Sequence, residues 1–154
     1  MAFPTLDYNL INKSDVPSAL GGQAVQLVHV SKTFVTGSLA AGKVTAVLRM
    51  PANTRYVDLY AEADDLDSDG TPALTLDVGI AGVSDTTYDD VDAFLDGSTI
   101  GQAGTGGDQV LLQAGAGLFV PVEHYITVTA AVAADTAVEG DVTLGIQCVL
   151  GVES

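Results

Sequence analysis

The chain has 154 residues, a mass of 15.7 kDa and a net charge of −15, with 47% hydrophobic and only 16% charged residues. This length suits one domain with a real core, and the hydrophobic content excludes disorder over most of the chain. The negative charge excludes nucleic acid and anionic membranes as main partners, because both would repel the protein. We therefore expect no nucleic-acid partner and no membrane partner.

The charge is unevenly divided along the sequence. Residues 1–57 hold all five lysines and arginines and two of the acids, a net charge of +3, whereas residues 58–154 hold eighteen acids and no lysine or arginine. Two explanations stay open. Such a surface keeps a protein soluble, and it also keeps a protein hydrated in high salt, where the repulsion between its charges is screened.

Residues 1–23 differ from the rest of the chain. They contain Pro4, Pro17 and the pair Gly21-Gly22, and they show no sustained hydrophobic period. We expect an extended arm that becomes ordered against a partner or a neighbouring subunit. The arm does not resemble a secretory signal, because no basic stretch is followed by an apolar one. Residues 24–154 are predicted to form one β-domain.

From Ala24 onward, hydrophobic residues alternate with polar ones. About eight such segments are separated by turn residues, a pattern typical of an all-β, antiparallel sandwich or barrel. In residues 55–63 the pattern assigns Val57 to the interior and Tyr56 to the outer face. The expected strands cover residues 24–34, 43–50, 55–63, 73–80, 108–113, 118–124, 125–132 and 141–152.

One segment departs from this alternation. Hydrophobic residues recur at helical spacing around DDVDAFLDG (residues 89–97), with Asp85 or Thr87 as the N-cap and Gly97 just past the end. We expect one short surface helix here that covers an opening of the sandwich. Its apolar face would consist of Tyr88, Val91, Phe94 and Leu95.

The stretch DLDSDG (residues 65–70) matches the first half of an EF-hand calcium loop. A complete loop needs a glutamate at its twelfth position, where this chain has Leu76, and Pro72 occupies the eighth. An EF-hand is therefore excluded. Two interpretations remain: a solvated turn between two strands, or a loop that holds calcium with further oxygens from elsewhere. The calcium ligands would then be Asp65, Asp67 and Asp69; no other cofactor is expected.

No catalytic motif stands out. The glycine cluster GQAGTGG (residues 101–107) lacks the lysine of a phosphate loop and is expected to be a flexible loop. The only histidines, His29 and His124, lack the spacing of a local metal-ligand pair. His124 follows Glu123 at a strand end and is expected to form a surface hydrogen bond. Cys148 lies on the apolar face of its strand, so we expect a buried, inert thiol. The protein is expected not to be an enzyme.

Two stretches of the sequence carry a resemblance to a known group of proteins. They are TPALTLDVG (residues 71–79) and DAFLDGSTIGQAG (residues 92–104), and the resemblance extends over most of residues 24–150. The chain resembles the small all-β virion structural proteins of tailed double-stranded DNA viruses. The resemblance implies a jelly-roll-like sandwich and, among decoration (cement) proteins, a homotrimer on the outer capsid surface. Such a protein clamps neighbouring subunits of the major capsid protein, with an N-terminal arm that reaches across the shell.

On this interpretation the arm supplies the contacts with the major capsid protein. Its apolar anchors and its one cation would be Phe3, Leu6, Tyr8, Leu10, Ile11 and Lys13. The alternative is a head-fibre or tail-associated module that binds a receptor or glycan. In that case exposed Tyr56, Tyr60 and Tyr88 would surround a calcium-loaded loop at Asp65–Asp69.

Overall fold

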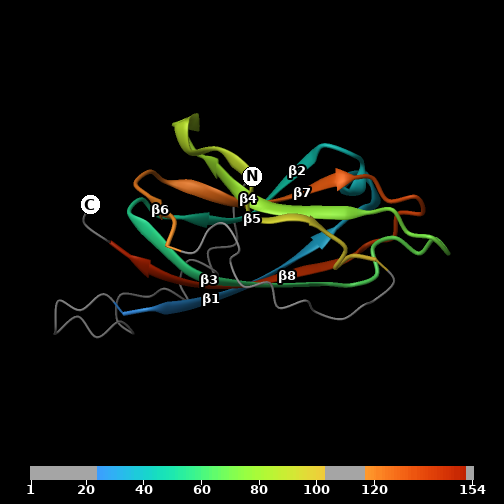
Figure 1. The fold of residues 1–154 in the computed structure, drawn as a ribbon, viewed down its shortest axis with the longest axis horizontal. Coiled ribbons are helices and arrows are strands. Elements are labelled where there is room, and N and C mark those ends of the chain that lie inside the picture. The colour runs from blue at the N-terminus through green and yellow to red at the C-terminus, as the bar shows by residue number, and fades with distance from the viewer. Residues whose placement is uncertain (1–23, 103–116, 152–154) are drawn as a thin grey trace.

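The computed structural model describes residues 24–102 and 117–151, which form two packed β-sheets (Figure 1). Two short 3₁₀ turns, η2 (Thr36–Leu39) and η3 (Thr86–Tyr88), connect strands. The expected strand at residues 108–113 lies outside the described residues. No helix in the described ranges is long and apolar enough to cross a membrane. The strands are β1 (Gln26–Phe34), β2 (Lys43–Met50), β3 (Thr54–Ala63), β4 (Thr75–Gly82), β5 (Asp90–Ser98), β6 (Phe119–Val120), β7 (His124–Val132) and β8 (Gly140–Leu150).

The strand order is that of a jelly roll. One sheet has the order β1-β8-β3-β6 and the other β2-β7-β4-β5, and all neighbours are antiparallel. The strands pair as in one long hairpin: β1 with β8, β2 with β7, β3 with β6 and β4 with β5. Successive pairs belong to alternate sheets, as in a jelly roll. The predicted antiparallel, jelly-roll-like sandwich of about eight strands is confirmed.

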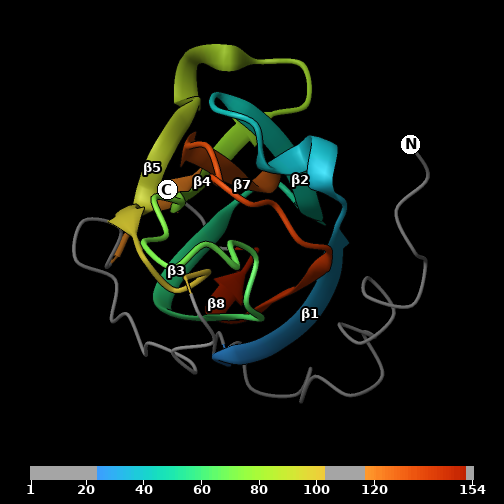
Figure 2. The ribbon, with the colours of Figure 1, turned by 90° about the vertical axis from the view of Figure 1, so that its right-hand side faces the viewer.

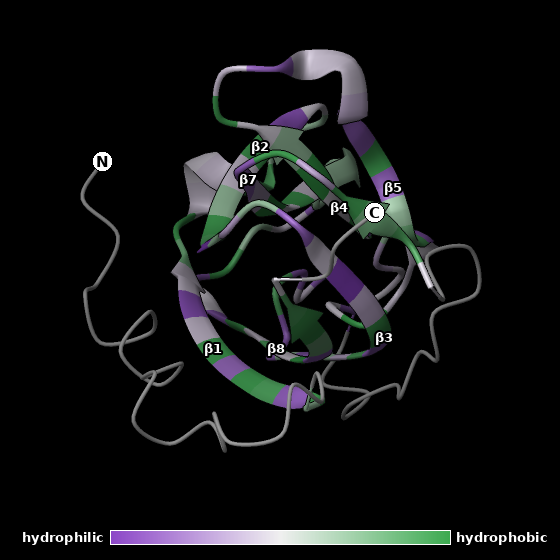
Figure 3. Cartoon of the chain, turned by 90° about the vertical axis from the view of Figure 1, so that its left-hand side faces the viewer, coloured by the Kyte–Doolittle hydropathy of each residue, from purple (hydrophilic) through white to green (hydrophobic). Residues whose placement is uncertain are grey.

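The core lies between the two sheets and follows the alternation along the strands. In β1, Val28, Val30 and Phe34 are buried, whereas His29, Ser31 and Thr33 are exposed. The alternating green and purple bands along β1 in Figure 3 show the same pattern. In β8, Cys148 is buried as predicted, together with the inward-facing residues of that strand. Apolar burial of this kind is the main force that holds the sheets together.

Two β-bulges reverse the faces that simple alternation predicts. In β3 the register shifts between Tyr56 and Asp58, so Tyr56 is fully buried and Val57 is 43% exposed. The prediction for these two residues is wrong, because a bulge inserts one extra residue, so the sides of the residues before it are the reverse of the alternation that holds after it. A second bulge, between Ala46 and Leu48 of β2, leaves Val44 exposed.

The helix predicted around residues 89–97 is wrong. Asp85 does act as an N-cap, since its side chain accepts a hydrogen bond from the Thr87 N–H, but the turn that it caps is only η3. The segment that follows is strand β5, which lies at the edge of its sheet next to β4, across the molecule from β1 (Figure 2). Its pairing with β4 shifts register twice. As a result, three consecutive residues, Ala93–Leu95, are buried. Two of them, Phe94 and Leu95, belong to the set whose spacing predicted a helix.

The start of β5 packs directly on the backbone of β4. A Cβ added at Gly79 would collide with the main-chain atoms of Asp90 and Val91. Glycine is therefore required at this position for close approach rather than for an unusual backbone angle.

Candidate functional site

Asp67 is the centre of the acidic loop, and it is fully buried. Its Oδ2 accepts hydrogen bonds from the backbone N–H groups of Ala73 (2.9 Å), Leu74 (3.0 Å) and Asp135 (3.1 Å). Its Oδ1 accepts one from the N–H of Thr136 (2.9 Å). One carboxylate therefore joins the loop before β4 to the loop between β7 and β8. Burial opposes the ionisation of Asp67, but these four donors outweigh it and lower its pKa to about 2.

The other two predicted calcium ligands also face the backbone. Asp65 accepts a hydrogen bond from the Asp67 N–H, and Asp69 accepts from both the N–H and the hydroxyl of Thr71. These are the local bonds by which aspartate stabilises turns. Among the described residues, no group of three or more His, Cys, Asp or Glu side chains is arranged to hold a metal ion. The loop is thus built as a connection between segments, and calcium binding stays a prediction.

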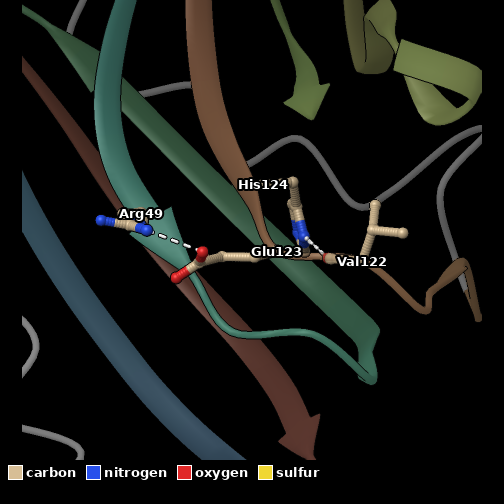
Figure 4. Close-up of polar contacts among 4 residues, drawn as sticks. All are labelled: Arg49, Val122, Glu123 and His124. Atoms are coloured by element: carbon tan, nitrogen blue, oxygen red, sulfur yellow. Dashed lines mark hydrogen bonds and ion pairs between the residues drawn. The ribbon is translucent and has the colours of Figure 1, made fainter. Parts of the chain in front are cut away.

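His124 begins β7, and its side chain and that of the preceding Glu123 point in different directions (Figure 4). Glu123 forms an ion pair with Arg49 of β2 at 2.6 Å, with both side chains nearly half exposed. A pair so accessible to water contributes little to stability. His124 is fully buried, so the predicted surface hydrogen bond of this residue is wrong.

His124 instead connects the two sheets inside the core. Its Nδ1 lies 2.8 Å from the Val122 carbonyl oxygen, which can only accept, so Nδ1 carries the proton. Its Nε2 therefore accepts the hydrogen bond from the Tyr56 hydroxyl of β3, at 2.5 Å. The Tyr56 ring also meets Phe94 of β5 edge-on, with ring centroids 4.8 Å apart. Burial lowers the pKa of His124 and raises that of Tyr56, so both stay neutral near pH 7.

The outer face of the sheet β1-β8-β3 holds a groove of about 250 Å³. Its middle row is His29, Gly145 and Tyr60, which are paired across the three strands. A Cβ at Gly145 would lie 3.4 Å from the Tyr60 ring and 3.9 Å from the His29 ring, so the two rings flank the bare backbone of β8. We call this the Gly145 groove.

A second row extends the Gly145 groove toward the beginning of β1. It consists of Leu27, Gln147 and Asp58, paired across the same strands. Leu27 is 69% exposed, and Val25 and Val57 are also exposed apolar residues. The residues that line the groove include one carboxylate, that of Asp58, and no lysine or arginine. The groove therefore combines an apolar surface with an acidic rim.

The arm residues predicted to contact the capsid, Phe3 to Lys13, lie outside the described residues. The described chain begins at Ala24, two residues before β1 and three before Leu27.

The fold resembles that of chains in two phage capsids. A chain of the cyanophage Pam1 capsid asymmetric unit aligns over 90% of this chain and 96% of its own length, with 24% identity and a TM-score of 0.62. A chain of the Ralstonia phage GP4 capsid aligns over 90% of both chains, with 23% identity and a TM-score of 0.67. No protein-family profile and no curated protein sequence matches the chain. At these identities the likeness shows a shared fold.

Sequence reasoning missed both the role of Asp67 and the Gly145 groove. The partners of Asp67 at positions 135 and 136 lie 68 and 69 residues away, so no local motif contains them. The groove depends on the pairing of three strands. The one signal in the sequence is Gly145 itself, a glycine inside a strongly alternating segment.

Proposed function

We propose that this protein is a non-enzymatic structural component of a tailed-virus particle, and that it acts as a capsid decoration protein. The observation that carries the proposal is the fold, which this chain shares over 90% of its length with chains of two phage capsids. The resemblance of TPALTLDVG and DAFLDGSTIGQAG to small virion proteins supports the same conclusion.

In the proposed mechanism, the protein binds the assembled shell but not isolated shell subunits. Such selective binding stabilises the assembled state by linkage. The arm inserts its apolar residues, Phe3 to Ile11, between subunits of the major capsid protein, and Lys13 meets an acidic group there. A homotrimer would engage three such arms together, so that weak contacts add up through multivalency. The acid-rich part of the chain faces solvent on the outer surface of the capsid.

Binding to purified heads tests this proposal. The wild-type chain is expected to co-sediment with heads from which it has been removed, and cryo-electron microscopy should place its density on the outer surface. A variant without residues 1–23 should bind much more weakly. Density on a tail fibre, or no binding of the wild-type chain to heads, would contradict a decoration role. Undiminished binding of the shortened variant would remove the arm from the mechanism.

The alternative, a receptor- or glycan-binding module, has lost one of its proposed contacts. Tyr56 is fully buried and cannot stack on a sugar. Calcium at Asp65–Asp69 is a separate proposal, which isothermal titration tests. Heat in the wild type that disappears in Asp69→Ala would support an ion there, and equal absence of heat in both would leave the loop as a turn.

A further inference from the structure

The Gly145 groove is an exposed feature of the molecule that the sandwich itself does not explain. Its volume of about 250 Å³ falls below the usual range of small-molecule pockets, about 300–1,000 Å³, and suits one or two side chains. Its apolar edge continues in Leu27, which is 69% exposed near the start of the edge strand β1. Apolar surface of this kind, rimmed by polar groups, marks interaction sites.

The charge around the groove selects the kind of partner. Asp58 lines the groove, and Glu62 follows one row further, where it accepts a hydrogen bond from the Tyr60 hydroxyl. No lysine or arginine lines the groove. A basic side chain complements this rim, whereas nucleic acid would be repelled. A second copy docked through the same face would bring two acidic rims together, which is unfavourable.

The position of the groove connects it with the arm. The described chain begins at Ala24, and Leu27, only three residues later, lines the groove. If residues 1–23 bind the shell, the chain leads from the shell to the beginning of β1, beside this groove. The groove then lies next to the point where the chain arrives from the shell.

We propose that the Gly145 groove binds an extended segment of the shell protein, one that presents an aliphatic side chain next to a lysine or arginine. The aliphatic side chain packs over Gly145 between His29 and Tyr60 and against Leu27. The cation meets Asp58 at the rim. This inference rests on the proposed decoration function and assigns a second contact to it, separate from the arm.

Binding of full-length variants to heads that lack the protein tests the groove. Leu27→Glu puts a charge on its apolar edge, and Val91→Glu is the matched control, because Val91 is 50% exposed on β5 of the other sheet. We expect Leu27→Glu to weaken binding at least tenfold and Val91→Glu to change it less than twofold. Asp58→Lys should weaken binding as well, whereas Asp92→Lys on β5 should not. Circular dichroism and thermal unfolding confirm that each variant is folded.

A photo-crosslinking side chain at position 27 identifies the occupant. Cross-links to a lysine- or arginine-containing segment of the shell protein are the expected result. Cross-links to another copy of this chain, or within one chain, would overturn the inference. Equal binding of Leu27→Glu and Val91→Glu to heads that the wild type binds normally would also overturn the inference about the groove. That result would leave the proposed decoration function intact. Failure of the wild type itself to bind heads would overturn both.

Discussion

Replacing Asp67 with asparagine tests whether one carboxylate holds the two loops together. The substitution preserves size but removes the charge and replaces one acceptor oxygen with an NH₂ donor. The N–H groups of Ala73, Leu74, Asp135 and Thr136 would then share a single oxygen, and if it takes the place of Oδ2 and keeps three of the bonds, the N–H of Thr136 faces the NH₂ donor instead of an acceptor. Each buried donor left without a partner costs about 1–3 kcal/mol. We expect the free energy of unfolding to fall by about 3 kcal/mol.

Urea-induced unfolding, followed by far-ultraviolet circular dichroism at pH 7, measures this loss. With a slope of about 2 kcal/mol/M, a loss of 3 kcal/mol lowers the midpoint by about 1.5 M. Asp85→Asn is the control, because Asp85 accepts its backbone bond from Thr87 within the same turn and an amide oxygen can do the same. Its cost should stay within about 0.5 kcal/mol. Equal midpoints for the two variants would refute the role assigned to Asp67.

The dependence of the free energy of unfolding on pH below pH 4 gives a second test of the role of Asp67. Because the pKa of Asp67 is lowered from 3.8 to about 2, its contribution is complete above pH 3.8 and is lost as the pH falls toward 2. By linkage this contribution is at most about 2.5 kcal/mol, and less where water screens the carboxylate. The decline of stability between pH 4 and pH 2 should be shallower in Asp67→Asn. An identical decline in variant and wild type would assign the acid sensitivity to other groups.

Three further predictions concern two buried side chains, His124 and Cys148, and the close contact of Gly79 with the backbone of β5. Because burial lowers the pKa of His124, its contribution to stability is present above pH 6.5 and is lost as the pH falls below it; urea midpoints at pH 7 and pH 5 should therefore differ less in His124→Phe, and equal differences would contradict this. Gly79→Ala should destabilise the protein by more than about 2 kcal/mol in thermal unfolding, since its methyl group meets the β5 backbone, whereas Gly70→Ala, which meets nothing within 4 Å, should change it by less than about 0.5 kcal/mol. Burial raises the pKa of Cys148 to about 11, so a thiol reagent at pH 8 should react only after unfolding; rapid reaction of the folded protein would show that the strand opens.

The sequence determines the strands through alternation, but it does not reveal where alternation breaks. The alternation in residues 55–63 also assigns Leu59 and Ala61 to the interior, where both are buried, yet it exchanges Tyr56 and Val57, because the bulge depends on the pairing with β8. The error at β5 has the same origin, since its burial pattern reflects register shifts against β4. Local periodicity reports the inner and outer sides of a strand only while both partners stay in register.

The structure also changes the meaning of the acidic composition. A surface adapted only for solubility or salt needs charge, and glutamate would serve as well as aspartate, yet the chain has sixteen aspartates and four glutamates. The short side chain of aspartate can reach nearby backbone N–H groups, which glutamate does less readily. Within residues 24–102 and 117–151, nine aspartates accept such bonds: Asp58, Asp64, Asp65, Asp67, Asp69, Asp77, Asp85, Asp89 and Asp90.

Part of the negative charge is therefore a consequence of how the loops are built. Most of these bonds span only a few residues, and an asparagine oxygen can replace the carboxylate in them at little cost. Asp67 is different, because it is fully buried and four backbone N–H donors from two separate loops use both of its oxygens. Converting local acceptors such as Asp65 and Asp85 to asparagine lowers the net charge while it leaves the turns in place. That separates the effect of charge on solubility from the effect of Asp67 on the fold.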